Sequence, residues 1–308
     1  MRAGFIGLGT MGASMALNVR AAGYDIVVND LRRAASAPHL KAGATWADSA
    51  RKVAEAANVV FTSLPAPREV EEVALAEDGL LAGMRRGTAW FDLSTNSPTV
   101  VRRLHERFAT KGVAMLDSPV SGGPAGAKSR KLALWVSGDQ AAFDRHKLVL
   151  DTIGDQAMYV GPIGGGTVAK LVHNTAGYAI LAALAEVFTL GVKAGVEPLA
   201  LWQAVRQGAF GRRRTFDRLA ERFLPHLFDP PAFALKLAHK DITLATELGR
   251  ELNVPLRIAT LVHEELTAAL NRGWADHDSR VFMLLQEERA GVNIAVPADE
   301  IQKALARG

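Results

Sequence analysis

The stretch Phe5-Ile6-Gly7-Leu8-Gly9-Thr10-Met11-Gly12 decides the fold of this chain. A short apolar run ends at Ile6, three glycines follow in the spacing G-x-G-x-x-G, and a helical pattern then continues to Gly23. Gly7 permits a tight turn, Gly9 lets the backbone approach a pyrophosphate, and Gly12 allows close helix packing. Because the N-terminus of the helix then faces the phosphates, the stretch predicts a dinucleotide-binding loop.

The second apolar run, Ile26–Val28, ends at Asn29 and Asp30. A carboxylate at this place binds the 2′-hydroxyl of the adenosine ribose and repels a 2′-phosphate. We therefore predict NAD as the cofactor, with Asn29 and Asp30 in its binding site. Arg32 and Arg33 stand close by and keep NADP as an alternative.

Apolar runs alternate with helical patterns through the first half of the chain. Further strands are expected at residues 59–61, 89–91, 113–116 and 132–136. This alternation predicts a parallel, doubly wound sheet that is covered on both faces. Ser63-Leu64-Pro65 and Ser94-Thr95-Asn96 follow two of these strands, where either segment could contact a ligand or cap a helix.

The second half has helical periods only, from Thr167 to about Arg289. Residues 168–193 are apolar nearly all round, which predicts a long, buried helix. The most apolar part, residues 176–185, ends at Glu186 and is too short to span a bilayer. The fold class is thus α/β: a doubly wound Rossmann domain (1–163), an all-α domain (164–296) and a C-terminal tail (297–308).

The composition limits the class of protein. The chain has 308 residues, 49% of them hydrophobic, and no cysteine, which excludes a disulfide framework and a thiolate metal site or nucleophile. The net charge is +4, but the basic residues form scattered pairs without interleaved aromatics, so we expect no nucleic-acid partner. The N-terminus does not resemble a signal peptide. We expect a cytoplasmic protein without a membrane partner or a metal site.

A second glycine-rich segment, Asp117-Ser-Pro-Val-Ser-Gly-Gly-Pro-Ala-Gly126, follows a predicted strand. Glycines after Ser121 expose several backbone N–H groups together, and such a nest binds an anion, most simply a carboxylate. A glycine- and proline-rich turn without function is the alternative.

The third signal is Gly164-Gly-Gly-Thr-Val-Ala-Lys-Leu-Val-His-Asn174. A glycine-rich turn opens a helix here, and Lys170, His173 and Asn174 follow at the spacing i, i+3 and i+4, on one helical face. A lysine within an apolar stretch is costly to bury, and a surface lysine with its stem on apolar groups is the alternative. An ammonium and a carboxamide on one face can hold and protonate a small oxygenated substrate.

Together with Lys240-Asp241, these segments resemble the β-hydroxyacid dehydrogenase family, which includes 3-hydroxyisobutyrate dehydrogenase and tartronate semialdehyde reductase. The matching pieces span almost the whole chain in the family's order. The resemblance implies hydride transfer between NAD(P) and a small 3-hydroxy acid, a long helix that bridges the two domains, and a homodimer or homotetramer.

The resemblance also implies roles for individual residues. Lys170 would be the catalytic general acid/base. The substrate carboxylate would be held by Ser121, Gly122 and Gly123, and the substrate oxygens by Asn174. The cofactor cleft would be lined by Met11, Leu64, Pro65 and Thr95, with Lys240 near the nicotinamide.

The far end of the substrate site is less defined. The segment Lys170-Leu-Val-His173-Asn174 resembles the form of this motif in the larger 6-phosphogluconate dehydrogenases. The length of the chain argues against an enzyme of that longer kind. Arg212, Arg213 or Arg214 could pair with a second anion or form a solvated basic turn. Phe233 could be a pocket wall or core. Two other functions remain open: an imine reductase, which typically lacks the pocket lysine, and a non-catalytic nucleotide-binding module.

Overall fold

The protein forms two compact units, Met1–Val172 (unit 1) and His173–Gly308 (unit 2). The computed structural model describes residues 1–208, 211–213 and 216–306, with all side chains except those of residues 186, 187, 190, 213 and 216. The long helix α9 starts in unit 1 and continues in unit 2.

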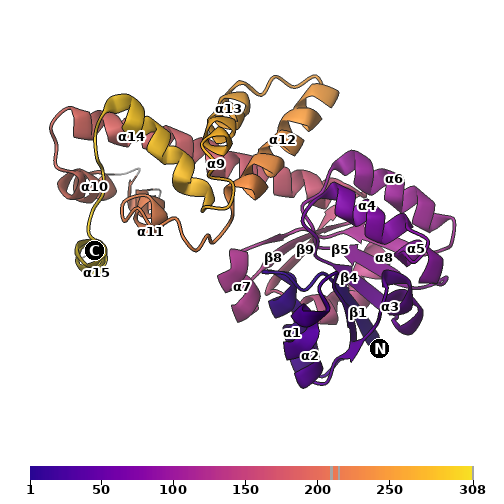
Figure 1. The fold of residues 1–308 in the computed structure, drawn as a ribbon. Coiled ribbons are helices and arrows are strands. Elements are labelled where there is room, and N and C mark those ends of the chain that lie inside the picture. The colour runs from indigo at the N-terminus through magenta and orange to yellow at the C-terminus, as the bar shows by residue number, and fades with distance from the viewer. Residues whose placement is uncertain (209–210, 214–215, 307–308) are drawn as a thin grey trace. The chain divides into compact units, whose positions relative to one another are not determined.

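Unit 1 is built on one nine-stranded sheet, drawn in indigo to magenta in Figure 1. Its strands are β1 (Arg2–Ile6), β2 (Asp25–Asn29), β3 (Thr45–Trp46), β4 (Val59–Thr62), β5 (Ala89–Asp92), β6 (Ala114–Asp117), β7 (Val120–Ser121), β8 (Ala133–Ser137) and β9 (Gln156–Gly161). Their order is β3-β2-β1-β4-β5-β6-β8-β7, and β9 also pairs with β8. The strands from β3 to β6 are parallel, which confirms the predicted doubly wound Rossmann fold.

The sheet departs from the prediction at one end. Strand β8 runs antiparallel to β6 and β7, and β9 runs parallel to β8. The short strands β3 and β7 and the strand β9 were not among the predicted ones. The predicted parallel order therefore holds from β3 to β6 and does not extend to β8, because the chain turns back on itself through the glycine-rich segment between β7 and β8.

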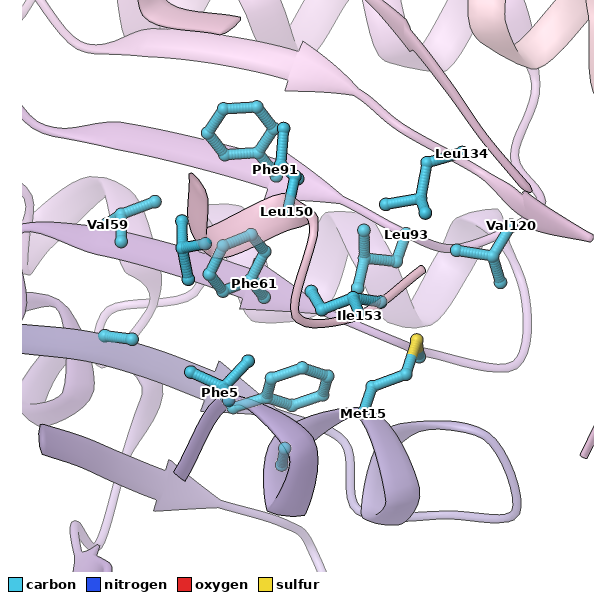
Figure 2. Close-up of a cluster of buried hydrophobic side chains, with 14 of the residues drawn as sticks. Phe5, Met15, Val59, Phe61, Phe91, Leu93, Val120, Leu134, Leu150 and Ile153 are labelled. Carbon is cyan, nitrogen blue, oxygen red and sulfur yellow. The ribbon is translucent and has the colours of Figure 1, made fainter. Parts of the chain in front are cut away.

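Helices cover the sheet of unit 1 and enclose two apolar clusters. These helices are α1 (Gly12–Ala21), η1 (Arg33–Ser36), α2 (Ala37–Lys41), α3 (Ala50–Ala56), α4 (Pro67–Leu75), α5 (Leu80–Gly83), α6 (Pro98–Ala109), α7 (Gly123–Ser129) and α8 (Gln140–Leu150). Phe5, Phe61 and Phe91 lie on adjacent strands in one cluster (Figure 2). The ring centroids of Phe5 and Phe61 are 6.1 Å apart, and those of Phe61 and Phe91 are 5.6 Å apart. Their sequence neighbours lie in the other cluster: Ile6, Val60 and Trp90. This alternation is what a sheet buried on both faces requires.

Unit 2 is helical, and its described residues contain no strand beyond an isolated bridge between Ala234 and Asp278. Its elements after α9 (Gly165–Lys193) are α10 (Pro198–Gln207), η2 (Gly211–Arg213), η3 (Phe216–Arg218), α11 (Leu219–Arg222), α12 (Leu235–Glu251), α13 (Arg257–Asn271), η4 (Ser279–Met283), α14 (Leu284–Ala290) and α15 (Ala298–Ala306). A third apolar cluster, which includes Phe188, Trp202 and Leu266, holds them together. An all-α second domain is confirmed.

The predicted long helix is present as α9, but the expectation that it is buried is wrong. Val172 and Ile180 are 64% and 42% exposed. By length and composition alone, Gly165–Ala185 could cross a membrane, with a mean hydropathy of 1.2 and 28% of the segment buried. This apolar segment is thus longer than residues 176–185, which were predicted to be too short to span a bilayer. A single such helix is weak evidence, because core helices of soluble proteins pass the same test.

Candidate active site

The glycine loop between β1 and α1 has the geometry of a phosphate cradle. A Cβ on Gly7, where φ is 92°, would lie 2.2 Å from the carbonyl oxygen of Ser63, and one on Gly12 would lie 1.9 Å from that of Gly7. A Cβ on Gly9, in contrast, would meet nothing within 4 Å. Gly7 and Gly12 are thus required by packing, whereas Gly9 leaves open space that fits the close approach of a pyrophosphate.

Asn29 and Asp30 tie the end of β2 to this loop. Oδ2 of Asp30 accepts a 2.7 Å hydrogen bond from the N–H of Leu8, and Oδ1 accepts one of 2.8 Å from the N–H of Arg32. Asn29 accepts from the N–H of Gly7 at 3.0 Å through its backbone oxygen. Since each carboxylate oxygen has two lone pairs, Asp30 retains acceptor capacity for a ribose hydroxyl.

The basic residues beside Asp30 are exposed. Nε of Arg32 lies 3.8 Å from Oδ1 of Asp30, and the Arg32 side chain is 74% exposed. Arg33 lies over the Trp46 ring, 5.4 Å from its centroid, and 3.5 Å from Asp48. Arg32 is therefore the arginine nearer to Asp30 in this part of unit 1.

The strand ends after β4 and β5 do not cap the next helices. The N-cap of α4 is Ala66 and that of α6 is Ser97, so the capping alternative is wrong for both segments, Ser63-Leu64-Pro65 and Ser94-Thr95-Asn96. The N–H of Leu64 donates to Oγ of Ser94 at 2.9 Å, which joins the two strand ends. Contact of these residues with a cofactor stays a prediction, as does that of Met11, which precedes α1 and packs against the apolar core.

The last residue of β5, Asp92, is a buried carboxylate three residues before Thr95. Asp92 accepts hydrogen bonds from Thr62 (2.9 Å), the N–H of Ser94 (3.2 Å) and the amide of Asn96 (2.9 Å). Burial raises the pKa of Asp92, although these hydrogen bonds act in the opposite direction. The network fixes the backbone at the predicted cofactor edge.

The turn after Ser121 requires its glycines. Gly122 and Gly123 have φ values of 132° and 61°, a region that favours glycine. A Cβ on Gly122 would lie 3.0 Å from Leu132, whereas one on Gly123 would meet nothing within 4 Å. Ser121 is half-buried at the end of β7. The turn has the backbone conformation expected of an anion nest, and its role in carboxylate binding stays a prediction.

The helix with Lys170 starts on a buried carboxylate. Oδ1 of Asp117 accepts from the N–H of Gly164 at 2.9 Å and from the hydroxyl of Ser137. Oδ2 accepts from the N–H and the hydroxyl of Thr167 at 2.6 and 2.7 Å. Asp117 is 1% exposed, and Lys170 is half-buried one helical turn after Thr167.

In unit 2, the carboxylate of Asp241 contacts two of the predicted site residues. Nδ2 of Asn174 donates to Oδ2 of Asp241 at 2.6 Å, and Nζ of Lys240 lies 3.0 Å from Oδ1 of the same residue. Oδ1 of Asn174 lies 2.9 Å from Nδ1 of His173, whose side chain is exposed. The structure thus brings Asn174, His173 and Lys240 together around Asp241.

The predicted distal residues are in other surroundings. Nε of Arg212 donates to the backbone oxygen of Gln207 at 2.9 Å, and its side chain is exposed. Phe233 packs against the apolar core of unit 2. Arg214 and the side chain of Arg213 lie outside the described residues. A role for Arg212 or Phe233 in substrate binding stays a prediction.

Sequence reasoning assigned no role to the two carboxylates that organise these groups. Asp117 and Asp241 appeared only as members of motifs, although an aspartate at the end of a strand or inside an apolar helical face is a signal for a buried acceptor. No group of three or more metal-ligating side chains occurs in the part of the chain that the structure describes.

Comparisons with known proteins identify the family of the two halves of the chain. Residues 2–161 match the family model described as the NAD binding domain of 6-phosphogluconate dehydrogenase. Residues 164–285 match the one described as NAD-binding of NADP-dependent 3-hydroxyisobutyrate dehydrogenase.

Individual relatives cover nearly the whole chain. The chain is 33% identical to 2-(hydroxymethyl)glutarate dehydrogenase of Eubacterium barkeri, over 96% of this chain and 98% of that protein. It is 34% identical to 2-hydroxy-3-oxopropionate reductase of Escherichia coli, over 92% and 97%. The crystal structure of a 3-hydroxyisobutyrate dehydrogenase from Salmonella typhimurium superposes with a TM-score of 0.81 at 28% identity, covering 92% of this chain and 99% of that one.

Proposed function

This chain belongs to the β-hydroxyacid dehydrogenase family, and we propose that it transfers a hydride between NAD(P) and a small 3-hydroxy acid or its semialdehyde or keto form, with Lys170 as general acid/base. One observation carries the proposal: a single compact unit, residues 1–172, contains the glycine loop, the Ser121–Gly123 turn and Lys170. Cofactor binding, anion binding and proton transfer can therefore be supplied by one compact unit.

When bound, NAD(P) supplies the hydride chemistry of the reaction. Lys170, as the neutral amine, takes the proton of the substrate hydroxyl during oxidation. As the ammonium, it donates that proton to the developing alkoxide during reduction. The protein contributes geometry and charge, which are the terms that make such a proton transfer fast.

The remaining groups hold the substrate. The N–H groups of Gly122 and Gly123 and the hydroxyl of Ser121 bind the substrate carboxylate, in accordance with the positive φ values of the two glycines. We propose that Asn174 positions the substrate oxygens through its carboxamide and that Lys240 contacts the cofactor. The hydrogen bond from Asn174 to Asp241 supports a fixed direction for this carboxamide.

We propose NAD as the preferred cofactor. The carboxylate of Asp30 ends β2 beside the glycine loop, where it accepts a ribose hydroxyl and repels a 2′-phosphate. The exposed guanidinium groups of Arg32 and Arg33 favour NADP, and Arg32 lies 3.8 Å from Asp30.

The assembly and the location of the protein belong to the same proposal. We propose a cytoplasmic homodimer or homotetramer without nucleic-acid or membrane partners. Exposed apolar side chains support association between copies, since contiguous apolar surface is typical of interfaces. These side chains include Leu252, Val254, Ile258 and Leu261 around the start of α13.

The proposal is tested with a panel of 3-hydroxy acids and NAD+, followed by NADH absorbance, in the wild type and in Lys170→Ala. We expect Lys170→Ala to lower kcat by about 10²- to 10⁴-fold, the usual contribution of a general acid/base, with the Kd for NADH unchanged. Lys193→Ala is the matched control, because Lys193 lies on the same helix and donates to the backbone oxygen of Ala290.

Two outcomes would count against the proposal. If both proteins bind NADH and neither turns over any acid, the chain is a nucleotide-binding module. If both reduce cyclic imines and neither oxidises a hydroxy acid, the chain is an imine reductase.

A further inference from the structure

The N-terminus of α9 is closed by groups within unit 1. Each of the four N–H groups from Gly164 to Thr167 has an acceptor. Gly164 and Thr167 donate to the two oxygens of Asp117, Gly166 donates to Oγ of Ser137 at 2.9 Å, and Gly165 donates to the backbone oxygen of Pro162 at 3.0 Å. A helix normally leaves these groups unsatisfied. Since the side chains of Asp117 and Ser137 accept hydrogen bonds from three of these N–H groups, the glycine-rich turn attaches the helix to the sheet.

A missing side chain permits this attachment. A Cβ on Gly166 would lie 2.1 Å from the backbone oxygen of Trp135 and 3.1 Å from that of Asp117. The first turn of α9 therefore approaches the backbone of β8 and β6 to within a distance that only glycine allows. This approach lets the short side chains of Ser137 and Asp117 reach the helix.

The attachment fixes the rotation of α9 about its own axis. Oδ2 of Asp117 accepts both the N–H and the hydroxyl of Thr167, so this residue has one orientation relative to the sheet. Lys170 follows Thr167 by three residues and lies on the same side of the helix. A substitution of Asp117 that weakens these hydrogen bonds therefore shifts or rotates the first turn of α9, and with it the Cβ of Lys170.

The same carboxylate is joined to the predicted substrate turn. Asp117 ends β6 and pairs with Ser137, and four residues later Ser121 of β7 pairs with Ala133 of the same strand, β8. The segment from Asp117 to Ser121 is thus held along one strand. Its two ends are the anchor of the Lys170 helix and the turn that contains Gly122 and Gly123.

We propose that Asp117 is a positioning residue for catalysis, which sets Lys170 relative to the Ser121–Gly123 turn through the first turn of α9. This inference rests on the proposed function, because it assigns to Asp117 the placement of the proton carrier. Asp117 touches neither substrate nor cofactor in this role.

Asparagine is a poor substitute for this aspartate. Each oxygen of Asp117 accepts one backbone N–H and one hydroxyl. In either orientation, the NH2 group of an asparagine would face a backbone N–H of Gly164 or Thr167, which cannot turn away. Asp117→Asn therefore keeps the size of the side chain and removes one of the two backbone hydrogen bonds, from Gly164 or from Thr167, that hold the start of the helix.

The test compares four variants at a temperature at which all are folded: Asp117→Asn, Thr167→Val, Thr167→Ser and Val149→Ala. Thr167→Val removes one hydroxyl bond to Asp117, and Thr167→Ser restores it. Val149, which is buried in α8 and makes none of these hydrogen bonds, is the control for lost stability alone. The measurements are kcat and KM for the best hydroxy acid, the Kd for NADH, and amide hydrogen exchange of residues 163–172.

We expect Asp117→Asn to lower kcat by about 10- to 100-fold, the range that a displacement of about 1 Å produces, with the Kd for NADH within about twofold of the wild type. Thr167→Val should lower kcat less, and Thr167→Ser should recover it. Exchange at the start of α9 should accelerate in Asp117→Asn and Thr167→Val. Val149→Ala should lower the Tm and leave kcat unchanged.

The proposal is overturned if Asp117→Asn and Thr167→Val keep the wild-type kcat, or if Val149→Ala loses as much. Should Asp117→Asn not fold, the Thr167→Val and Thr167→Ser pair decides by the same comparison. A wild-type kcat in Lys170→Ala would count against the proposed function itself. A loss in Lys170→Ala without a loss in Asp117→Asn counts against this inference alone.

Discussion

Nδ2 of Asn174 donates a 2.6 Å hydrogen bond to Oδ2 of Asp241, a carboxylate that is 1% exposed and whose Oδ1 lies 3.0 Å from Nζ of Lys240. One buried anion therefore directs both a carboxamide and an ammonium that we propose to contact substrate and cofactor. A buried carboxylate is tolerated here because Asn174 donates a hydrogen bond to Oδ2 and the ammonium of Lys240 compensates its charge, although Oδ1 accepts no hydrogen bond from the residues that the structure describes.

Asp241→Asn should weaken this arrangement. The NH2 group of the new side chain would face either the amide of Asn174 or the ammonium of Lys240, so one of them must turn away. We expect kcat/KM for the hydroxy acid to fall by about 10- to 100-fold, as for the loss of a hydrogen bond to a charged group. Steady-state kinetics measure this effect.

The matched control for Asp241→Asn is Asp276→Asn. Asp276 also bonds a lysine of α12, Lys236, at 2.6 Å, but both side chains are more than half exposed. Exposed ion pairs contribute little. An equal loss of kcat/KM in the two variants would contradict a specific role for Asp241.

The glycine loop gives a contrast between two alanine substitutions. Gly12→Ala should lower the Tm, because its Cβ would lie 1.9 Å from the backbone oxygen of Gly7. Gly9→Ala should keep the Tm, since nothing lies within 4 Å of the added Cβ, but should raise the Kd for NADH by about tenfold or more. Thermal unfolding and fluorescence titration separate the two effects. Unchanged NADH binding in Gly9→Ala would contradict the pyrophosphate contact.

Cofactor preference should depend on Asp30. Replacing its carboxylate by the amide in Asp30→Asn removes the charge that repels a 2′-phosphate and keeps an acceptor for the N–H of Leu8, while the hydrogen bond from the N–H of the exposed Arg32 is lost. We expect the ratio of kcat/KM with NAD to that with NADP to fall by about tenfold. Arg32→Ala should raise the ratio, because it removes the guanidinium that favours a phosphate. A ratio that neither variant changes would place the choice of cofactor elsewhere.

The stability of unit 2 should decrease in acid because of Asp278. Burial raises the pKa of this carboxyl, but hydrogen bonding to and the charge of Arg280 outweigh burial and leave the pKa below its ordinary value of 3.8. A lowered folded-state pKa contributes stability that is present above the unfolded value and is lost as the pH falls through the folded value.

Denaturant unfolding of the wild type and of Asp278→Asn as a function of pH measures this contribution. The variant should be less stable at neutral pH, and the difference should shrink as the pH falls below about 3.8, the ordinary aspartate value. Glu247→Gln on the exposed face of α12 is the control. A difference that is constant over this pH range would show that Asp278 acts through packing alone.

The cofactor half of the fold could be predicted because local rules determine it. Gly7, Gly9 and Gly12 are recognisable from their spacing, and the parallel strands from their apolar runs. Strand β9 contains the apolar run Ala157-Met158-Tyr159-Val160, a signal for a strand that the prediction did not use. Strand β7 has two residues within a glycine- and proline-rich segment, which is too short for a periodic signal.

The partners of the buried carboxylates could not be predicted from the sequence. Asp117 bonds Ser137, twenty residues away, and Thr167, fifty residues away, whereas Asn174 and Asp241 are 67 residues apart. Such contacts depend on how the strands are ordered, which no local pattern encodes. The burial of α9 was predicted wrongly for a related reason: a helix that is apolar all round does not reveal which of its side chains the chain itself covers.

The antiparallel strand β8 has a consequence for how this protein can change. Ala133 and Ser137, its first and last residues, pair with Ser121 and Asp117. Deleting or inserting one residue between them would displace one pairing by about 3.3 Å and turn the following side chains to the opposite face of the sheet. Length variation among descendants of this chain is therefore expected in the surface loops and not in β8, and an engineer who wants to enlarge the substrate site has to alter side chains instead of chain length there.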